Sequence, residues 1–256
     1  MRISFVKYQG TGNDFVLIDN RTEFFPKGNL DLIRQLTKTK FGIGADGLIL
    51  VENHPSLDFE MVYFNSDASQ SLCGNGSICA VQFGRDLGII HNQTTFKTYD
   101  GVHDAYFKGG LVYFSLHALN EISSGGNYFF INNGSPHYVT FVSNVEKIDV
   151  NGQGAQIRNS KEFAPGGTNV NFVEIDHGLL KVRTYERGVE TETLSCGTGV
   201  TASAIVAAYA FEMESPITIE SRGGQLFVSF VKVGKSFSEI YLASRATKVF
   251  EGSIHI

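Results

Sequence analysis

The sequence has few cysteines, little charge and no long apolar run, and each scarcity argues against a class of protein. It contains 3 cysteines in 256 residues, with no Cys-x-x-Cys pair, which argues against a disulfide framework and a structural zinc site. Charged residues make up 18% of the chain, and the formal net charge is −5. No segment concentrates Lys and Arg, as a nucleic-acid or anionic-membrane partner would require.

No apolar run reaches the length of a membrane span, and the N-terminal stretch "MRISFVKYQG" lacks the apolar centre of a signal peptide. We therefore expect a globular, cytoplasmic protein with free thiols and no membrane partner. Its length and its 42% hydrophobic content allow two domains of ordinary size.

Most segments show the alternating or β-rich patterns of strands, and few show helical spacing. One helix is expected after Asn29, a second from Asn75 to Gly88, and a third, apolar on nearly every face and therefore buried, from about Thr198. Strands are expected at 3–8, 14–19, 47–52, 58–65, 111–117, 137–143, 170–175, 179–186, 225–231 and 237–243.

Two similar motifs lie about half a chain apart. Cys73 begins "CGNG" and Cys196 begins "CGTG", 123 residues later, and in each half strands precede the cysteine and a helix follows it. This repetition predicts an α+β fold of two similar domains, 1–116 and 117–243, each a largely antiparallel, curved sheet around a central helix.

A cysteine at the first turn of a helix has a distinct chemistry. Several N–H groups there lack intrahelical partners, and the helix dipole adds positive charge, so the position binds anions and favours a thiolate. Cys79, inside the expected helix among apolar neighbours, is interpreted as core filler. The "GIGADG" stretch at 42–47 fits the dinucleotide fingerprint in its letters only, because here a helix precedes it and a strand follows.

A pair of such cysteines suits the inversion of a carbon centre. One residue must remove a proton from one face while another delivers a proton to the opposite face, and a thiolate and a thiol across an interdomain cleft can do both near neutral pH. We see no metal-ligand cluster and no phosphate-binding loop, so the expected chemistry uses neither a metal nor another cofactor.

Seven motifs in order make the chain resemble the diaminopimelate epimerases, cofactor-independent enzymes related to the proline racemases. They are "GTGNDFV" at 10–16, "GIGADG" at 42–47, "FNSDAS" at 64–69, "CGNG" at 73–76, "GSPH" at 134–137, "TNVNFV" at 168–173 and "YERGVETETLSCGTG" at 185–199. The resemblance implies interconversion of LL- and meso-diaminopimelate in lysine and peptidoglycan-precursor biosynthesis. It also implies two barrel-like domains, with the segment 244–256 returning to the first.

The resemblance assigns roles residue by residue. Cys73 and Cys196 become the acid and the base, supported as proton acceptors by His137 and Glu186. The distal amino-acid end of the substrate would be held by Asn13, Asn65, Asn169, Glu186 and Arg187, and the reacting carboxylate by the N–H groups of Gly74, Asn75, Gly197 and Thr198.

The chain departs from the family pattern in places, and alternatives stay open. Ser135 stands where a substrate-contacting asparagine is usual, and Ser77 and Ile78 replace an Ala-Arg pair. The alternatives are a racemase of proline or hydroxyproline type, a phenazine-biosynthesis-like isomerase, and a non-catalytic binding relative. The first is disfavoured by the residues for a distal end, and the others because both cysteines are present. A homodimer stays open as an alternative to a monomer.

Overall fold

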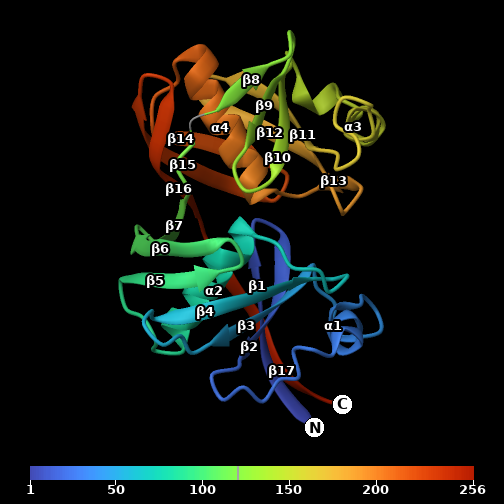
Figure 1. The fold of residues 1–256 in the computed structure, drawn as a ribbon, viewed down its shortest axis with the longest axis vertical. Helices are drawn as coiled ribbons and strands as arrows, with labels where there is room; N and C mark the ends of the chain where they lie inside the picture. The colour runs from blue at the N-terminus through green and yellow to red at the C-terminus, as the bar shows by residue number, and fades with distance from the viewer. Residues whose placement is uncertain (120) are drawn as a thin grey trace. The chain divides into compact units, whose positions relative to one another are not determined.

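The computed structural model describes residues 1–119 and 121–256, which form two compact units. The first comprises Met1–Phe114 together with Ser244–Ile256, and the second comprises Ser115–Ala243 (Figure 1). The C-terminal segment thus belongs to the same unit as the N-terminus.

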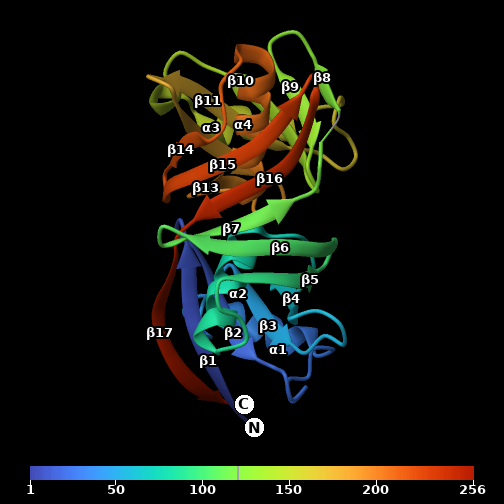
Figure 2. The same ribbon diagram turned by 90° about the vertical axis from the view of Figure 1, so that its left-hand side faces the viewer.

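Eight strands and two helices make up the first unit. Figure 2 shows β1 and β17 side by side, with the two chain ends at the same end of this antiparallel pair. The helices are α1 (Leu30–Thr37) and α2 (Gly74–Asp86). The strands, in spatial order, are β17 (Ala246–His255), β1 (Arg2–Gly10), β2 (Asn13–Asp19), β3 (Gly47–Glu52), β4 (Phe59–Asn65), β5 (Gln93–Thr98), β6 (Gly101–Lys108) and β7 (Leu111–Leu116).

The second unit has the same plan. Its helices are η1 (Val145–Lys147), α3 (Val150–Arg158) and α4 (Gly197–Phe211), and the short strand β13 (Thr191–Thr193) pairs with the end of β12. The sheet, in spatial order, is β8 (Ile122–Ser124), β9 (Phe129–Asn132), β10 (Pro136–Phe141), β11 (Asn169–Asp176), β12 (Leu179–Glu186), β14 (Ile217–Ser221), β15 (Gly224–Val233) and β16 (Ser236–Ser244).

The pairing of successive neighbouring strands is identical in the two units. Within the part of the chain that the structure describes, it runs antiparallel, antiparallel, parallel, antiparallel, parallel, antiparallel, antiparallel in both. A parallel pair needs a long crossover, usually helical, and α1, α2, α3 and α4 each lie in one of these crossovers. The α+β fold of two similar domains that the sequence predicts is therefore confirmed.

Helices α2 and α4 fill the centres of their units. The first twelve residues of α4, Gly197–Ala208, are all buried, as the apolar sequence predicts for this segment. Asn29 caps α1 as expected, since its side chain accepts from Leu32 N, and the helix ends at Thr37. Helix α2 begins one residue before Asn75. Among the described residues, no helix is both long and apolar enough to cross a membrane.

Candidate active site residues in the two units

Cys73 is the residue that caps helix α2. Its backbone is extended, with φ −131° and ψ 109°, and its Sγ accepts a hydrogen bond from Gly76 N at 3.4 Å. The sulfur also lies 3.7 Å from Oδ1 of Asn13, to which the thiol donates. The capping N–H and the helix dipole both favour negative charge on this sulfur.

The amide of Asn13 is fixed by a carboxylate that sequence reasoning missed. Asn13 Nδ2 donates to Asp46 Oδ2 at 2.6 Å, and the N–H of Asp14 donates to the same oxygen at 3.1 Å. Lys7 in turn lies 2.6 Å from Asp14 in an ion pair. Because Nδ2 is bound by Asp46, Oδ1 of Asn13 is left facing the thiol. Asp46 belongs to "GIGADG", and the presence of this stretch among the family motifs is the signal that could have identified it.

Asn65 ends strand β4, and its side-chain amide is fixed by hydrogen bonds to neighbouring residues of the first unit. Its Oδ1 accepts from Tyr63 Oη at 2.9 Å, and its Nδ2 donates to the hydroxyls of Ser69 and Ser71 at 3.0 and 3.2 Å. The chain from Asn65 to Cys73 is thereby folded back, so that Asn65 contacts a residue two positions before the thiol.

Cys196 caps α4 in the same conformation, with φ −114° and ψ 110°. It is only 7% exposed, and its Sγ lies 3.5 Å from Thr198 Oγ1. The first turn of α4 is held in place by Asn133, whose Nδ2 donates to the carbonyl of Thr198 at 2.8 Å.

Steric crowding explains why the second glycine of each Cys-Gly-x-Gly motif carries no side chain. A Cβ built on Gly76 would lie 3.4 Å from Cys73 Sγ, and a Cβ on Gly199 would lie 3.3 Å from Cys196 Sγ. Both glycines are the third residue of their helix; the N–H of Gly76 donates to Cys73 Sγ, whereas the side chain of Cys196 makes no capping hydrogen bond. The motif therefore places a sulfur against an unobstructed helix N-terminus, once in each unit.

The remaining residues assigned to the two N-termini are buried. Gly74 and Asn75 form the start of α2, and Gly197 and Thr198 form the start of α4. Their positions in the first turn are those at which the N–H groups of a helix can bind an anion.

Asn169, at the start of β11, is fixed by neighbours on both sides of its amide. Its Nδ2 donates to Ser135 Oγ at 2.9 Å and to the carbonyl of Pro136 at 3.0 Å, while its Oδ1 accepts from Arg187 N at 2.9 Å. Ser135, the departure noted in the sequence, thus supports Asn169. The same amide ties down the backbone of Arg187.

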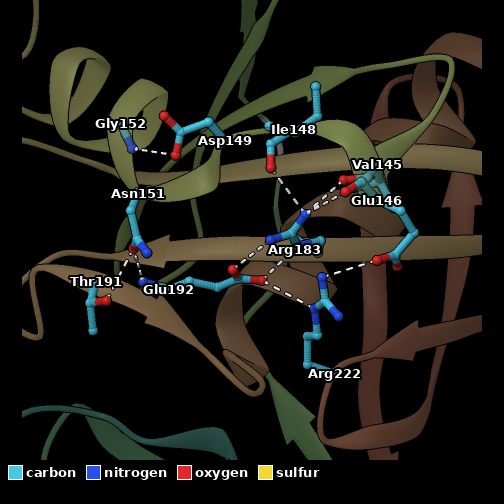
Figure 3. A network of polar contacts seen from close by, with 10 residues as sticks. All are labelled: Val145, Glu146, Ile148, Asp149, Asn151, Gly152, Arg183, Thr191, Glu192 and Arg222. Atoms are coloured by element: carbon cyan, nitrogen blue, oxygen red, sulfur yellow. Dashed lines mark hydrogen bonds and ion pairs between the residues drawn. The ribbon is translucent and has the colours of Figure 1, made fainter.

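Glu186 and Arg187 lie at the turn between β12 and β13. The two strands beside this turn are anchored by a network of polar contacts (Figure 3). Arg183 forms a two-pronged ion pair with Glu192, both distances 2.6 Å, and donates to the carbonyls of Val145 and Ile148. Asn151 on α3 accepts from Glu192 N at 2.7 Å. These contacts position the segment that leads into Cys196.

His137 is fully buried on β10, and its pKa is lowered from 6.5 to about 3, first by burial and then by the positive charge of Arg187. Its Nδ1 lies 3.2 Å from Asn171 Nδ2. Asn171 was missed at the sequence level. Its signal is the alternation with Asn169, which puts two amides on the same face of β11.

This buried histidine predicts a loss of stability in acid. The unfolded chain takes up a proton near pH 6.5 and the native protein only near pH 3, so the free energy of unfolding falls as pH drops through this window, by up to about 1.4 kcal/mol per pH unit. Urea unfolding of the wild type and of His137→Asn across pH 4–7 checks this: the wild type should lose more stability than the variant. Parallel curves for the two proteins would contradict it.

Cys79 does not lie at a helix N-terminus, unlike Cys73 and Cys196. It is 0% exposed within α2, and burial raises the pKa of its thiol well above the ordinary value. Its place in the core agrees with the interpretation made from the sequence.

Comparison with known proteins places these observations in a family. The family model described as diaminopimelate epimerase matches residues 5–108 and 129–249. The diaminopimelate epimerase of Flavobacterium psychrophilum is 49% identical over 97% of this chain and 98% of its own length, and that of Aquifex aeolicus is 41% identical over 98% of both.

Solved structures with low sequence identity share the fold. A Bacillus anthracis phenazine biosynthesis protein of the PhzF family superposes with a TM-score of 0.80 at 14% identity, covering 100% of both chains. A hydroxyproline epimerase from Agrobacterium vitis reaches 0.69 at 14% identity, over 99% of this chain and 92% of its own. The resemblance seen in the motifs is confirmed by the family model and the curated relatives: the chain belongs to the diaminopimelate epimerase family.

Proposed function

We propose that this protein interconverts LL- and meso-2,6-diaminopimelate, with Cys73 and Cys196 as the two proton-transfer groups. The observation that carries the proposal is the repeated N-cap cysteine: each unit places one thiol at the N-terminus of a buried helix, next to the second glycine of its Cys-Gly-x-Gly motif. Family membership supplies the substrate, because the curated relatives are named for it.

In the proposed reaction one thiolate removes the α-proton and the other cysteine, as the thiol, delivers a proton to the opposite face. The proton removed stays on the first sulfur, so each turnover reverses the protonation states of the pair. The N–H groups of Gly74 and Asn75, with those of Gly197 and Thr198, would bind the carboxylate beside the reacting carbon and stabilise the negative charge that develops there. The substrate is activated by these groups and not by pyridoxal phosphate.

The distal amino-acid end needs partners for an ammonium and a carboxylate. Arg187 offers a guanidinium for the carboxylate and Glu186 a carboxylate for the ammonium, and the side chains of Asn13, Asn65 and Asn169 add amide groups. The network around Asn169 and the turn supports this role, because it holds Arg187 before any substrate arrives. His137 and Glu186 would assist the thiols.

The product serves lysine and peptidoglycan-precursor biosynthesis, and a cytoplasmic location is part of the same proposal. The test is to incubate purified protein with LL-diaminopimelate and separate the isomers by chiral chromatography, with L-proline and trans-4-hydroxy-L-proline as control substrates. Formation of meso-diaminopimelate alone supports the proposal. Inversion of proline or hydroxyproline, without meso-diaminopimelate, would overturn it.

Thiol labelling provides a second prediction. Iodoacetamide should inactivate the enzyme by modifying Cys73 or Cys196, whereas Cys79, at 0% exposure with a raised pKa, should stay unmodified in the native protein. Peptide mass mapping during inactivation measures this, and diaminopimelate should slow the labelling. Loss of activity in step with labelling of Cys79 is the opposing result.

A further inference from the structure

A cluster of polar side chains lies inside the second unit, on one face of three neighbouring strands. His137 on β10, Asn171 on β11 and Thr184 on β12 are exposed by 0%, 0% and 3%. Asn171 and Thr184 are direct partners in the antiparallel pair of β11 and β12. Buried polar groups are costly unless each finds a partner, so the pattern of donors and acceptors in this cluster constrains its members.

The orientation of the Asn171 amide is set by a backbone carbonyl. Asn171 Nδ2 lies 2.9 Å from the carbonyl oxygen of Tyr138, which can only accept. The opposite orientation would place two carbonyl oxygens in contact. Oδ1 of Asn171 accepts from the hydroxyl of Thr184 at 2.9 Å, in agreement with this assignment.

With the amide so oriented, the second hydrogen of Asn171 Nδ2 points to Nδ1 of His137, 3.2 Å away. Nδ1 must then be the acceptor, and in a neutral imidazole the ring proton resides on the other nitrogen. We infer that Asn171 is a positioning residue that holds His137 as the neutral Nε2–H tautomer, so that His137 offers a hydrogen-bond donor through Nε2 and not a proton acceptor.

This tautomer changes the role expected for His137 in the reaction from a proton acceptor to a hydrogen-bond donor. Nε2 is buried and has no hydrogen-bond partner within residues 1–119 and 121–256. A buried N–H without a partner costs about 1–3 kcal/mol, so the group is available to an anionic acceptor. The low pKa of His137 agrees with a ring that stays neutral. The role in epimerisation rests on the proposed function, whereas the tautomer does not.

The tautomer can be observed directly by NMR without any substrate. In protein labelled with ¹⁵N-histidine, long-range ¹H–¹⁵N correlations distinguish a protonated ring nitrogen from a bare one, and His137→Asn identifies the relevant signals among the 7 histidines by their loss. At neutral pH, Nε2 of His137 should be protonated and Nδ1 bare. A protonated Nδ1, or an average of both tautomers, would overturn the inference, whatever the outcome of the epimerase assay.

Two near-isosteric variants test the part of Asn171. In Asn171→Leu the donor to Nδ1 is lost, and the His137 signals should shift to those of the other tautomer or to an average. In the matched control Thr184→Val, the carbonyl of Tyr138 still orients the amide, and the Nε2–H tautomer should persist. An unchanged tautomer in folded Asn171→Leu, or a changed one in Thr184→Val, counts against the assignment. The unaffected signals of the other histidines report on folding.

Discussion

Replacing Cys73 or Cys196 by alanine is expected to lower kcat for epimerisation by about 10²- to 10⁴-fold, the usual contribution of a positioned acid or base. Each cysteine is the N-cap residue of its own helix, and in the proposed reaction each sulfur serves one face of the carbon. Neither can replace the other, so the two single variants should be similarly impaired. Initial rates of meso-diaminopimelate formation measure the effect.

Cys79→Ala is the matched control, because this third cysteine is buried within α2, the helix that Cys73 caps. It should retain kcat close to that of the wild type, with a modest loss of stability from the cavity. A Cys196→Ala protein that epimerises at the wild-type rate would refute the two-thiol reaction.

Gly199→Ala is expected to destabilise the protein by about 2–4 kcal/mol and to lower kcat by about 10²-fold. A Cβ at this position would lie 2.4 Å from Asn171 Oδ1 and 3.3 Å from Cys196 Sγ. Asn171 cannot yield without losing the buried hydrogen bonds described above. In an ordinary helix the same change stabilises, since alanine is the better helix former, so the sign of the effect is diagnostic.

Gly76→Ala, the equivalent substitution in the first unit, is the control for Gly199→Ala. The nearest atoms to a Cβ on Gly76 lie at 3.3 Å or more, so Gly76→Ala requires only small adjustments around Cys73. Urea unfolding and kcat for both variants should show a distinctly larger loss for Gly199→Ala. Equal and mild effects would mean that the first turn of α4 is looser than its contacts indicate.

The sequence predicts the central helices and most of the sheet because their patterns are strong. The strands at 47–52 and 179–186 are found with those bounds, and the apolar run after Cys196 forms the buried helix α4. Helix α3 was missed, since its nine residues "VNGQGAQIR" include two glycines and have little helical preference. It is held by the Asp149 cap and by packing against β11 and β12. Strand β17 was also missed, because nearly all of its residues are exposed and its sequence has no alternation of apolar and polar residues.

At the site, the motifs predict the residue types but not their partners. Cys73 and Cys196 follow from the repeated Cys-Gly-x-Gly pattern. Asp46 and Asn171 act through other side chains, and only the folded chain brings Asp46 to Asn13 and Asn171 to His137. The partly buried ion pair of Arg183 and Glu192, which anchors the turn after Glu186, likewise depends on strand pairing that no local pattern reveals.

The most direct test of the two-thiol reaction is the fate of the α-hydrogen in D₂O. LL-Diaminopimelate is incubated with the enzyme, and early samples of substrate and product are separated and examined by mass spectrometry and NMR. If one cysteine removes the proton and the other delivers a solvent-derived one, the meso product should carry deuterium at the inverted carbon while the remaining substrate stays protiated. Product that keeps the original hydrogen, or substrate that gains deuterium as fast as product appears, would contradict the account and point to a single base.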